Sequence, residues 1–168
     1  MEKLEIYRDL ASRNGWDFSM VDDRPYFMKN GDYASPNEDT SLEDKRLLAN
    51  IISEGSSELE KLILLSWNNG LTVTGPCSGI REYHDKPPIA LHFGVKGPME
   101  IVFPLYQSLL KDLPDYSHLC RDQDDITRYD FNYFLNGKTL SKEESEKIFK
   151  KINEEINEVL GKEKTKKL

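Results

Sequence analysis

The sequence predicts a single α+β domain with a small mixed or antiparallel sheet, packed by about four to five helices, the last of which is long. Three observations predict this class. Several segments carry apolar residues three and four positions apart, as amphipathic helices do. Shorter segments alternate apolar and polar residues, as half-buried strands do. The length, 168 residues, allows one ordinary hydrophobic core and no more.

The first third of the chain predicts a helix, a hairpin and a loop. We expect a helix from Glu2 to Arg13, ended by the pair Asn14-Gly15, because glycine readily adopts the left-handed conformation that stops a helix. Two strands should follow, the first alternating at Trp16, Phe18 and Met20, and the second from Arg24 to Lys29. The pair Asn30-Gly31 predicts the turn that ends this hairpin, and the polar stretch Gly31 to Thr40 predicts a loop.

Two adjacent helices are predicted next, each beginning at a serine. Ser41 is the expected N-cap of a helix that reaches Gly55, and Ser57 is expected to start the second, with Glu60 completing a capping box. The second helix should end at Asn69-Gly70. The residues expected to face the core are Leu47, Leu48, Ile51 and Ile52 of the first helix and Leu59, Leu62, Ile63 and Trp67 of the second.

The middle of the chain predicts two neighbouring strands. Leu71 to Thr74 and Ile89 to Phe93 have the apolar pattern of strands, and we expect them to be adjacent in one sheet, covered by the helices before and after them. The stretch Gly75 to Lys86 is expected to be irregular. A third strand is predicted at Glu100 to Phe103, and a helix from Pro104 to Lys111, since proline suits the first turn of a helix.

The last third predicts a long loop, a strand and a helix. The acidic stretch Leu113 to Asp130 is expected to be a surface loop, followed by a strand in which Tyr129, Phe131 and Tyr133 alternate, and a turn at Asn136-Gly137. Ser141 is the expected cap of a final helix, with Glu144 in the box position. Ile148, Ile152, Ile156 and Leu160 give this helix one apolar stripe, and Gly161 should end it. The domain would therefore span 1–161, with 162–168 a basic disordered tail.

Composition excludes several classes of protein. A content of 38% hydrophobic and 10% aromatic residues is too high for a disordered chain, and two cysteines are too few for a disulfide scaffold. No apolar run approaches the length of a spanning helix, and the N-terminus carries no secretory pattern, so we expect a cytoplasmic protein with reduced thiols. The net charge of -7 disfavours direct binding of DNA.

The segment Gly75 to Gly79 is the first candidate site. It follows a predicted strand, and its glycines allow backbone N–H groups to turn toward an anion. We therefore expect a small anionic or nucleotide-like ligand here. The residues expected to hold it are Gly75, Cys77, Ser78 and Gly79 in the loop, with Trp67, Arg81 and Tyr83 as its lining.

A cysteine-dependent enzyme is an alternative. Cys77 would be the nucleophile and His92 its base, since a thiol of this kind needs a proton acceptor within hydrogen-bond reach. His84 is a second candidate base, and Asp85 or Asp130 would orient the imidazole. The histidines and cysteines lack the spacing of a zinc site, so neither a metal nor a cofactor is predicted.

The same segment resembles part of a known family. Thr74, Cys77, Ser78 and Gly79 match the strand-ending motif Thr-Thr-Ser-Ser-Cys-Ser/Ala-Gly-Arg of a tRNA wybutosine-synthesis methyltransferase family, the component without an ordinary Rossmann domain. Gly75 and Pro76 replace its two serines and Ile80 its arginine, and a Gly-Lys turn before the last helix is also similar. The matching residues cover about a tenth of the chain. The resemblance implies a related α+β architecture and a loop that faces a ligand.

A non-enzymatic interaction protein is the remaining hypothesis. Small acidic proteins, such as inhibitors of defence nucleases or effectors, can occupy basic grooves on a protein partner. The predicted acidic loop would supply the contact surface, and the partner-binding residues would be Asp115, Tyr116, Asp122, Asp124 and Asp125.

Overall fold

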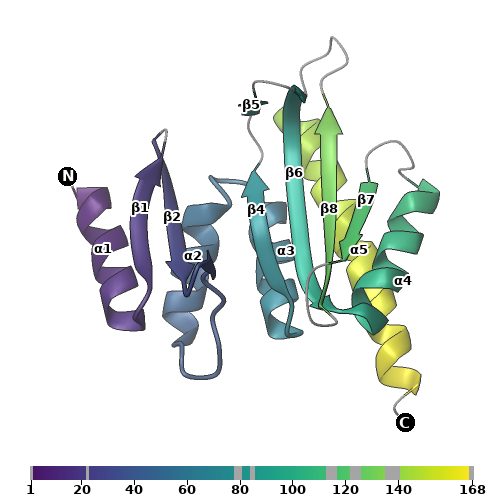
Figure 1. The fold of residues 1–168 in the computed structure, drawn as a ribbon, viewed down its shortest axis with the longest axis horizontal. Helices are drawn as coiled ribbons and strands as arrows, with labels where there is room; N and C mark the ends of the chain where they lie inside the picture. The colour runs from purple at the N-terminus through teal and green to yellow at the C-terminus, as the bar shows by residue number, and fades with distance from the viewer. Residues whose placement is uncertain are drawn as a thin grey trace.

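The computed structural model describes most of the chain. Its backbone is described at residues 2–21, 23–77, 81–83, 86–112, 117–121, 126–134 and 141–166, and its side chains at 2–21, 23–74, 93–108 and 141–161. Over these residues the chain has an α+β fold, with five helices and two antiparallel sheets of three and five strands (Figure 1).

The N-terminal elements form the smaller sheet and a helix beside it. Helix α1 spans Glu2–Asn14, and strands β1 (Asp17–Val21), β2 (Arg24–Lys29) and β3 (Asp32–Tyr33) pair in that order. The predicted helix and both predicted strands are confirmed, whereas β3 lies within the predicted loop. Asn30 and Gly31 have φ values of 52° and 80°, so two left-handed residues make the tight turn between β2 and β3.

Helices α2 (Leu42–Ile52) and α3 (Ser57–Asn68) follow. The Ser41 hydroxyl accepts a hydrogen bond from the Asp44 amide at 3.1 Å, which confirms the predicted N-cap of α2. The predicted cap of α3 is wrong by one residue, because Ser56 takes the extended conformation and accepts from the Leu59 amide. Glu60 therefore stands outside the box position. The four residues of α3 expected in the core, which include Trp67, are all buried.

The larger sheet contains β4 (Thr72–Cys77), β5 (Arg81–Tyr83), β6 (Lys86–Pro98), β7 (Ser117–Arg121) and β8 (Ile126–Phe134). Its order is β4-β6-β8-β7, with β5 also paired to β6. The predicted neighbouring strands are confirmed, since β4 and β6 pair antiparallel with Val73 opposite Val95. Figure 1 shows α3 and α5 behind this sheet, as the helices on one of its faces.

Three predicted irregular or strand segments are corrected. Strand β4 continues through Cys77, and β5 and the start of β6 occupy much of the stretch expected to be irregular. The predicted loop Leu113 to Asp130 contains β7 and the first part of β8, which pair antiparallel with His118 opposite Asp130. The predicted strand Glu100 to Phe103 is helical. Helix α4 spans Met99–Asp112 and includes Pro104, so the helix starts five residues before that proline.

The last helix, α5, spans Lys142–Lys166 and confirms the predicted Ser141 cap, which accepts from the Glu144 amide. Its apolar stripe is buried as expected, with Ile152 wholly inaccessible. The predicted end at Gly161 is wrong. Gly161 does not take a positive φ, and the residues that follow, rich in lysine and glutamate, favour the helical state and extend it to Lys166.

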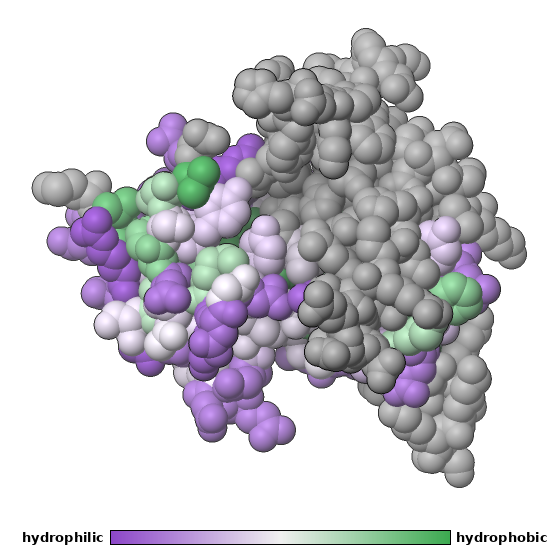
Figure 2. All heavy atoms as spheres, in the orientation of Figure 1, coloured by the Kyte–Doolittle hydropathy of each residue, from purple (hydrophilic) through white to green (hydrophobic). Residues whose placement is uncertain are grey.

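One cluster of buried residues joins the two sheets and the helices. Val73, Phe93 and Val95 of the larger sheet belong to this cluster with Leu62 of α3 and Ile152 of α5. Figure 2 shows that hydrophilic residues dominate the described surface of the N-terminal half, with smaller apolar areas among them. The exposed apolar residues there include Ile6, Met20 and Val21.

Candidate functional site

The larger sheet has an apolar face and a polar face. Val73 lies opposite Val95, and both are buried in the common core with the helices. Because successive residues of a strand alternate between faces, Thr72 and Thr74 lie on the other side of the sheet. Gly97 lies on the apolar face with Val95. A β-carbon built on Gly97 would meet Leu71 and Val102, and since Val102 belongs to α4, the apolar face is also turned toward α4.

The strand register defines three rows of opposed residues on the polar face. None of the residues in these rows has a large apolar side chain. Large apolar residues such as Val73, Phe93 and Val95 occupy neighbouring positions on the same strands. The rows are Cys77, His92 and Asn132; then Thr74, Gly94, Asp130 and His118; then Thr72, Lys96, Arg128 and Cys120. We call these the His92 row, the Gly94 row and the Lys96 row. Together they gather both cysteines and two of the three histidines of the chain.

The His92 row joins the two predicted catalytic residues. Cys77 lies directly opposite His92 across β4 and β6, and Asn132 lies opposite His92 on β8. The register between β4 and β6 shifts between Thr74 and Cys77, which is the signature of a bulge. Bulges often occur beside active sites, because they change the direction of the strand and of its side chains.

Thr74 holds a buried hydroxyl without a hydrogen bond. Thr74 is 2% exposed, and its Oγ1 has no hydrogen-bond partner in the part of the chain that the structure describes. A buried hydroxyl in a folded protein nearly always has a partner, so an orphan one requires an explanation such as a ligand or an ordered water. Thr74 belongs to the Gly94 row, next to the His92 row. Its neighbour across the strand is a glycine and so presents no side chain of its own.

The charge of the polar face differs from that of the whole chain. Its rows contain Lys96, Arg128 and two histidines against one carboxylate, Asp130, in a chain of net charge -7. Lys96 Nζ forms an ion pair with Asp32 Oδ2 at 3.0 Å, which ties β6 to β3. With Lys96 paired to Asp32, Arg128 and Asp130 are the remaining Lys, Arg, Asp or Glu residues of these rows, so this face is less negative than the chain as a whole.

The other residues predicted to hold the ligand lie in different parts of the fold. Trp67 is 7% exposed and belongs to the common core, and its Nε1 has no hydrogen-bond partner among the described residues, so its role in lining a ligand site stays a prediction. Gly75 and Cys77 lie within β4, so the first part of the expected open loop is a strand. Arg81 and Tyr83 lie on β5, opposite Ile89 and Lys86. Ser78 and Gly79 lie outside the described residues.

The predicted partner-binding residues also lie outside the described residues, as do the alternatives His84 and Asp85. These residues are Asp115, Tyr116, Asp122, Asp124 and Asp125. The hypothesis of an acidic surface that binds a basic partner therefore stays a prediction. Asp130, the other expected orienting residue, lies in the Gly94 row and not in the His92 row.

Asn132 is the one residue of the His92 row that the sequence analysis did not single out. The alternation of Tyr129, Phe131 and Tyr133 already placed it on the opposite face of that strand. Its register with His92 had no local signal, because the two strands are separated by a helix and by β7.

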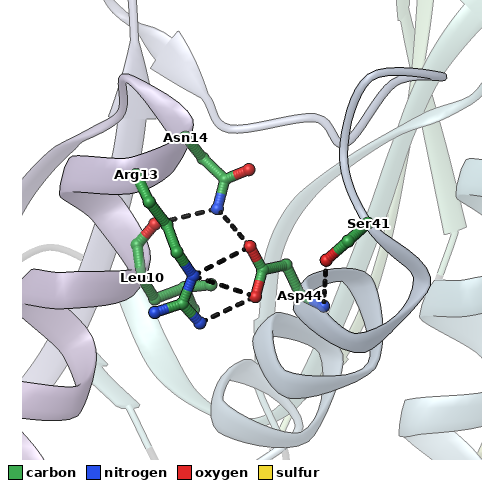
Figure 3. A network of polar contacts seen from close by, with 5 residues as sticks. All are labelled: Leu10, Arg13, Asn14, Ser41 and Asp44. Carbon is green, nitrogen blue, oxygen red and sulfur yellow. Dashed lines mark hydrogen bonds and ion pairs between the residues drawn. The ribbon is translucent and has the colours of Figure 1, made fainter.

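The densest described polar network surrounds Asp44 (Figure 3). Its carboxylate accepts from Arg13 Nη2 at 2.7 Å and from Asn14 Nδ2 at 2.9 Å. The hydrogen bonds from Arg13 lower the pKa of Asp44 below its ordinary value, with a smaller contribution from Asn14, and burial opposes them. Asn14 also donates to the Leu10 carbonyl. These bonds join α1 to α2 and satisfy the carboxylate, so the network is structural.

The described cavities do not enlarge this site. A cavity of about 50 Å³ lies between β2, α2 and β4, lined mainly by apolar side chains such as Phe27, Leu48 and Val73. It holds a few waters at most. A wider groove of about 620 Å³ runs over α1 and α2 past Tyr7 and Asn50, open to solvent.

Within the part of the chain that the structure describes, no helix is long and apolar enough to cross a membrane. The same residues contain no group of three or more His, Cys, Asp or Glu side chains arranged to hold a metal ion. No protein-family model, curated protein or solved structure matches the chain. The function must therefore be inferred from the polar face itself.

Proposed function

We propose that the protein binds a small anionic ligand, phosphate-bearing or nucleotide-like, on the polar face of the larger sheet at the end of β4. The observation that carries this proposal is the orphan hydroxyl of Thr74. A donor that is 2% exposed and without a partner loses the free energy of a hydrogen bond unless a ligand completes it.

The charge pattern supports an anion as the ligand. Arg128, Lys96 and the histidines occupy the rows around Thr74, and the rows contain one acidic residue. The rows are less negative than the chain as a whole, whose net charge is -7, and Arg128 is a cation of the Lys96 row with which a bound anion would interact favourably.

Thermal unfolding of wild type and of Thr74→Val tests the proposal, with inorganic phosphate, pyrophosphate and AMP as probes. A ligand that binds only the native state raises the melting temperature. We expect at least one probe to do so for wild type. Thr74→Val keeps the shape of the side chain and removes the orphan donor, so its melting temperature without ligand should rise. Its response to the same probe should fall.

Thr72→Val is the matched control. Thr72 lies on the same face of the same strand, and its hydroxyl is absent from the buried unpartnered groups of the described residues. This variant should keep the response to the probe. The proposal is wrong if no probe shifts wild type, or if Thr74→Val responds as strongly as wild type.

A further inference from the structure

We propose that Cys77 is a nucleophile that His92 deprotonates, that Asn132 positions His92, and that the group attacked is the acyl carbon of an anionic ester or amide. This inference rests on the proposed function, because it uses the same face of the sheet to hold the substrate. It goes further by assigning a reaction to the His92 row.

The backbone register brings the three residues of this row together. Residues directly opposite one another in an antiparallel pair have β-carbons about 4.5–5.5 Å apart and share a face of the sheet. Cys77 and His92 occupy such opposed positions, and so do His92 and Asn132. A nucleophile, a base and a group able to orient the base therefore occupy consecutive strands in one row, which is the arrangement that cysteine acyl transfer requires.

Thr74 provides the second, independent observation. Its unpartnered hydroxyl lies in the next row of the same face, and its side chain is only 2% exposed. A cysteine that only packs within a strand does not require a buried, unpartnered hydroxyl in the neighbouring row. A substrate bound on this face would accept the hydrogen bond of Thr74 and bring its acyl group to the His92 row.

The step balances without an added oxidant or cofactor. His92 takes the proton of the Cys77 thiol, and the sulfur forms a bond to the acyl carbon. As the tetrahedral adduct collapses, the bond from that carbon to the leaving oxygen or nitrogen breaks, and His92 returns the proton to the leaving group. Water then attacks the thioester, His92 takes a proton from it, and the carboxylic acid leaves with the thiol restored.

The test follows the pH dependence of alkylation of Cys77 by iodoacetamide, with Cys120→Ser as background so that one thiol remains. A thiolate stabilised by a neighbouring imidazolium is half-formed at or below about pH 7, against about 8.5 for a free thiol. We expect the low midpoint. In the same background, His92→Gln should move the midpoint toward that of a free thiol and slow alkylation at pH 6 at least tenfold.

Asn132→Ala has a separate readout. It should raise the midpoint of the alkylation profile by less than His92→Gln does and slow the release of nitrophenol from p-nitrophenyl acetate. Asn132→Gln should recover part of that rate. A positioning role is rejected if Asn132→Ala leaves both the profile and the rate unchanged.

The outcomes separate this inference from the proposed function. A midpoint near that of a free thiol in the Cys120→Ser background overturns the nucleophile even if phosphate or AMP stabilises the fold, and this measurement does not depend on how His92→Gln folds. A low midpoint that His92→Gln leaves in place overturns the role of His92. A low midpoint that requires His92, with no response to any anion, supports the nucleophile and rejects the anionic ligand.

Discussion

Glu146, near the start of α5, caps the N-terminus of α3 by accepting hydrogen bonds from Ser56 and Glu58. Its Oε1 accepts from the Ser56 hydroxyl, and its Oε2 accepts from the Glu58 amide at 3.0 Å. Ser56 in turn accepts from the Leu59 amide. A carboxylate that lies 90 positions away in the chain thus accepts from one of the first amides of α3, which have no partner within the helix.

The first prediction concerns this contact. Glu146→Ala should lower the free energy of unfolding by about 1.5–3 kcal/mol, because hydrogen bonds to a charged group are lost and a helix amide loses its partner. Urea denaturation measures it. Glu154→Ala, at an exposed position of the same helix, should change stability by less than about 0.5 kcal/mol. Equal effects of the two variants would show that the contact contributes nothing.

The second prediction concerns the Asp44 network. Asp44→Asn should cost about 1–3 kcal/mol at pH 7, toward the lower end because the Arg13 side chain is 49% exposed and its charge is partly screened. Asp39→Asn, an exposed residue outside the network, is the control. The two variants should differ in chemical denaturation at pH 7.

The same network predicts a pH dependence. The folded-state pKa of Asp44 is lowered, first by the hydrogen bonds from Arg13. Its contribution is therefore fully present above the unfolded value of about 3.9 and is lost as the pH falls through the folded value. The stability difference between wild type and Asp44→Asn should shrink as the pH falls below about 5. A difference that stays constant down to about pH 2 would contradict the assignment.

The third prediction concerns the apolar stripe of α5. Ile152 is wholly inaccessible, so Ile152→Ala removes buried methyl groups and leaves a cavity in the common core. It should cost about 2–5 kcal/mol. Lys150→Ala, on the exposed side of α5, is the control and should be nearly neutral. A cost under about 0.5 kcal/mol for Ile152→Ala in denaturant melts would mean that α5 does not dock through this stripe.

The fourth prediction concerns Gly161, which the helix passes through. A β-carbon there would meet no atom within 4 Å, and the residue is helical, so Gly161→Ala should stabilise the protein by about 0.5–1 kcal/mol. Gly70→Ala is a matched control, because its β-carbon is equally unobstructed but its φ is 76°. It should destabilise the protein. Destabilisation by Gly161→Ala would instead favour a helix that ends at that residue.

Local patterns in the sequence determined the helices that have both a stripe and a cap, the two strands after the first helix, and the turn at Asn30-Gly31. The strand Arg24 to Lys29 has the predicted bounds, because a proline, aromatic residues and a turn pair specify it within a few positions. The long α4 was predicted only in part. Its first turn contains apolar residues whose pattern also suits a strand, and packing against the sheet decided between the two.

The sequence by itself determined which residues can carry chemistry, since a thiol and an imidazole make Cys77 and His92 candidates by residue type alone. Only the tertiary structure decided which of them occupy opposed positions on neighbouring strands. The His92 row requires the order β4-β6-β8, and the cap of α3 by Glu146 requires that α5 pack beside α3. Strand order and register depend on contacts between distant segments, and a shift of one residue would move Asn132 to the other face. No local pattern of residues contains that information, so the row exists only in the folded sheet.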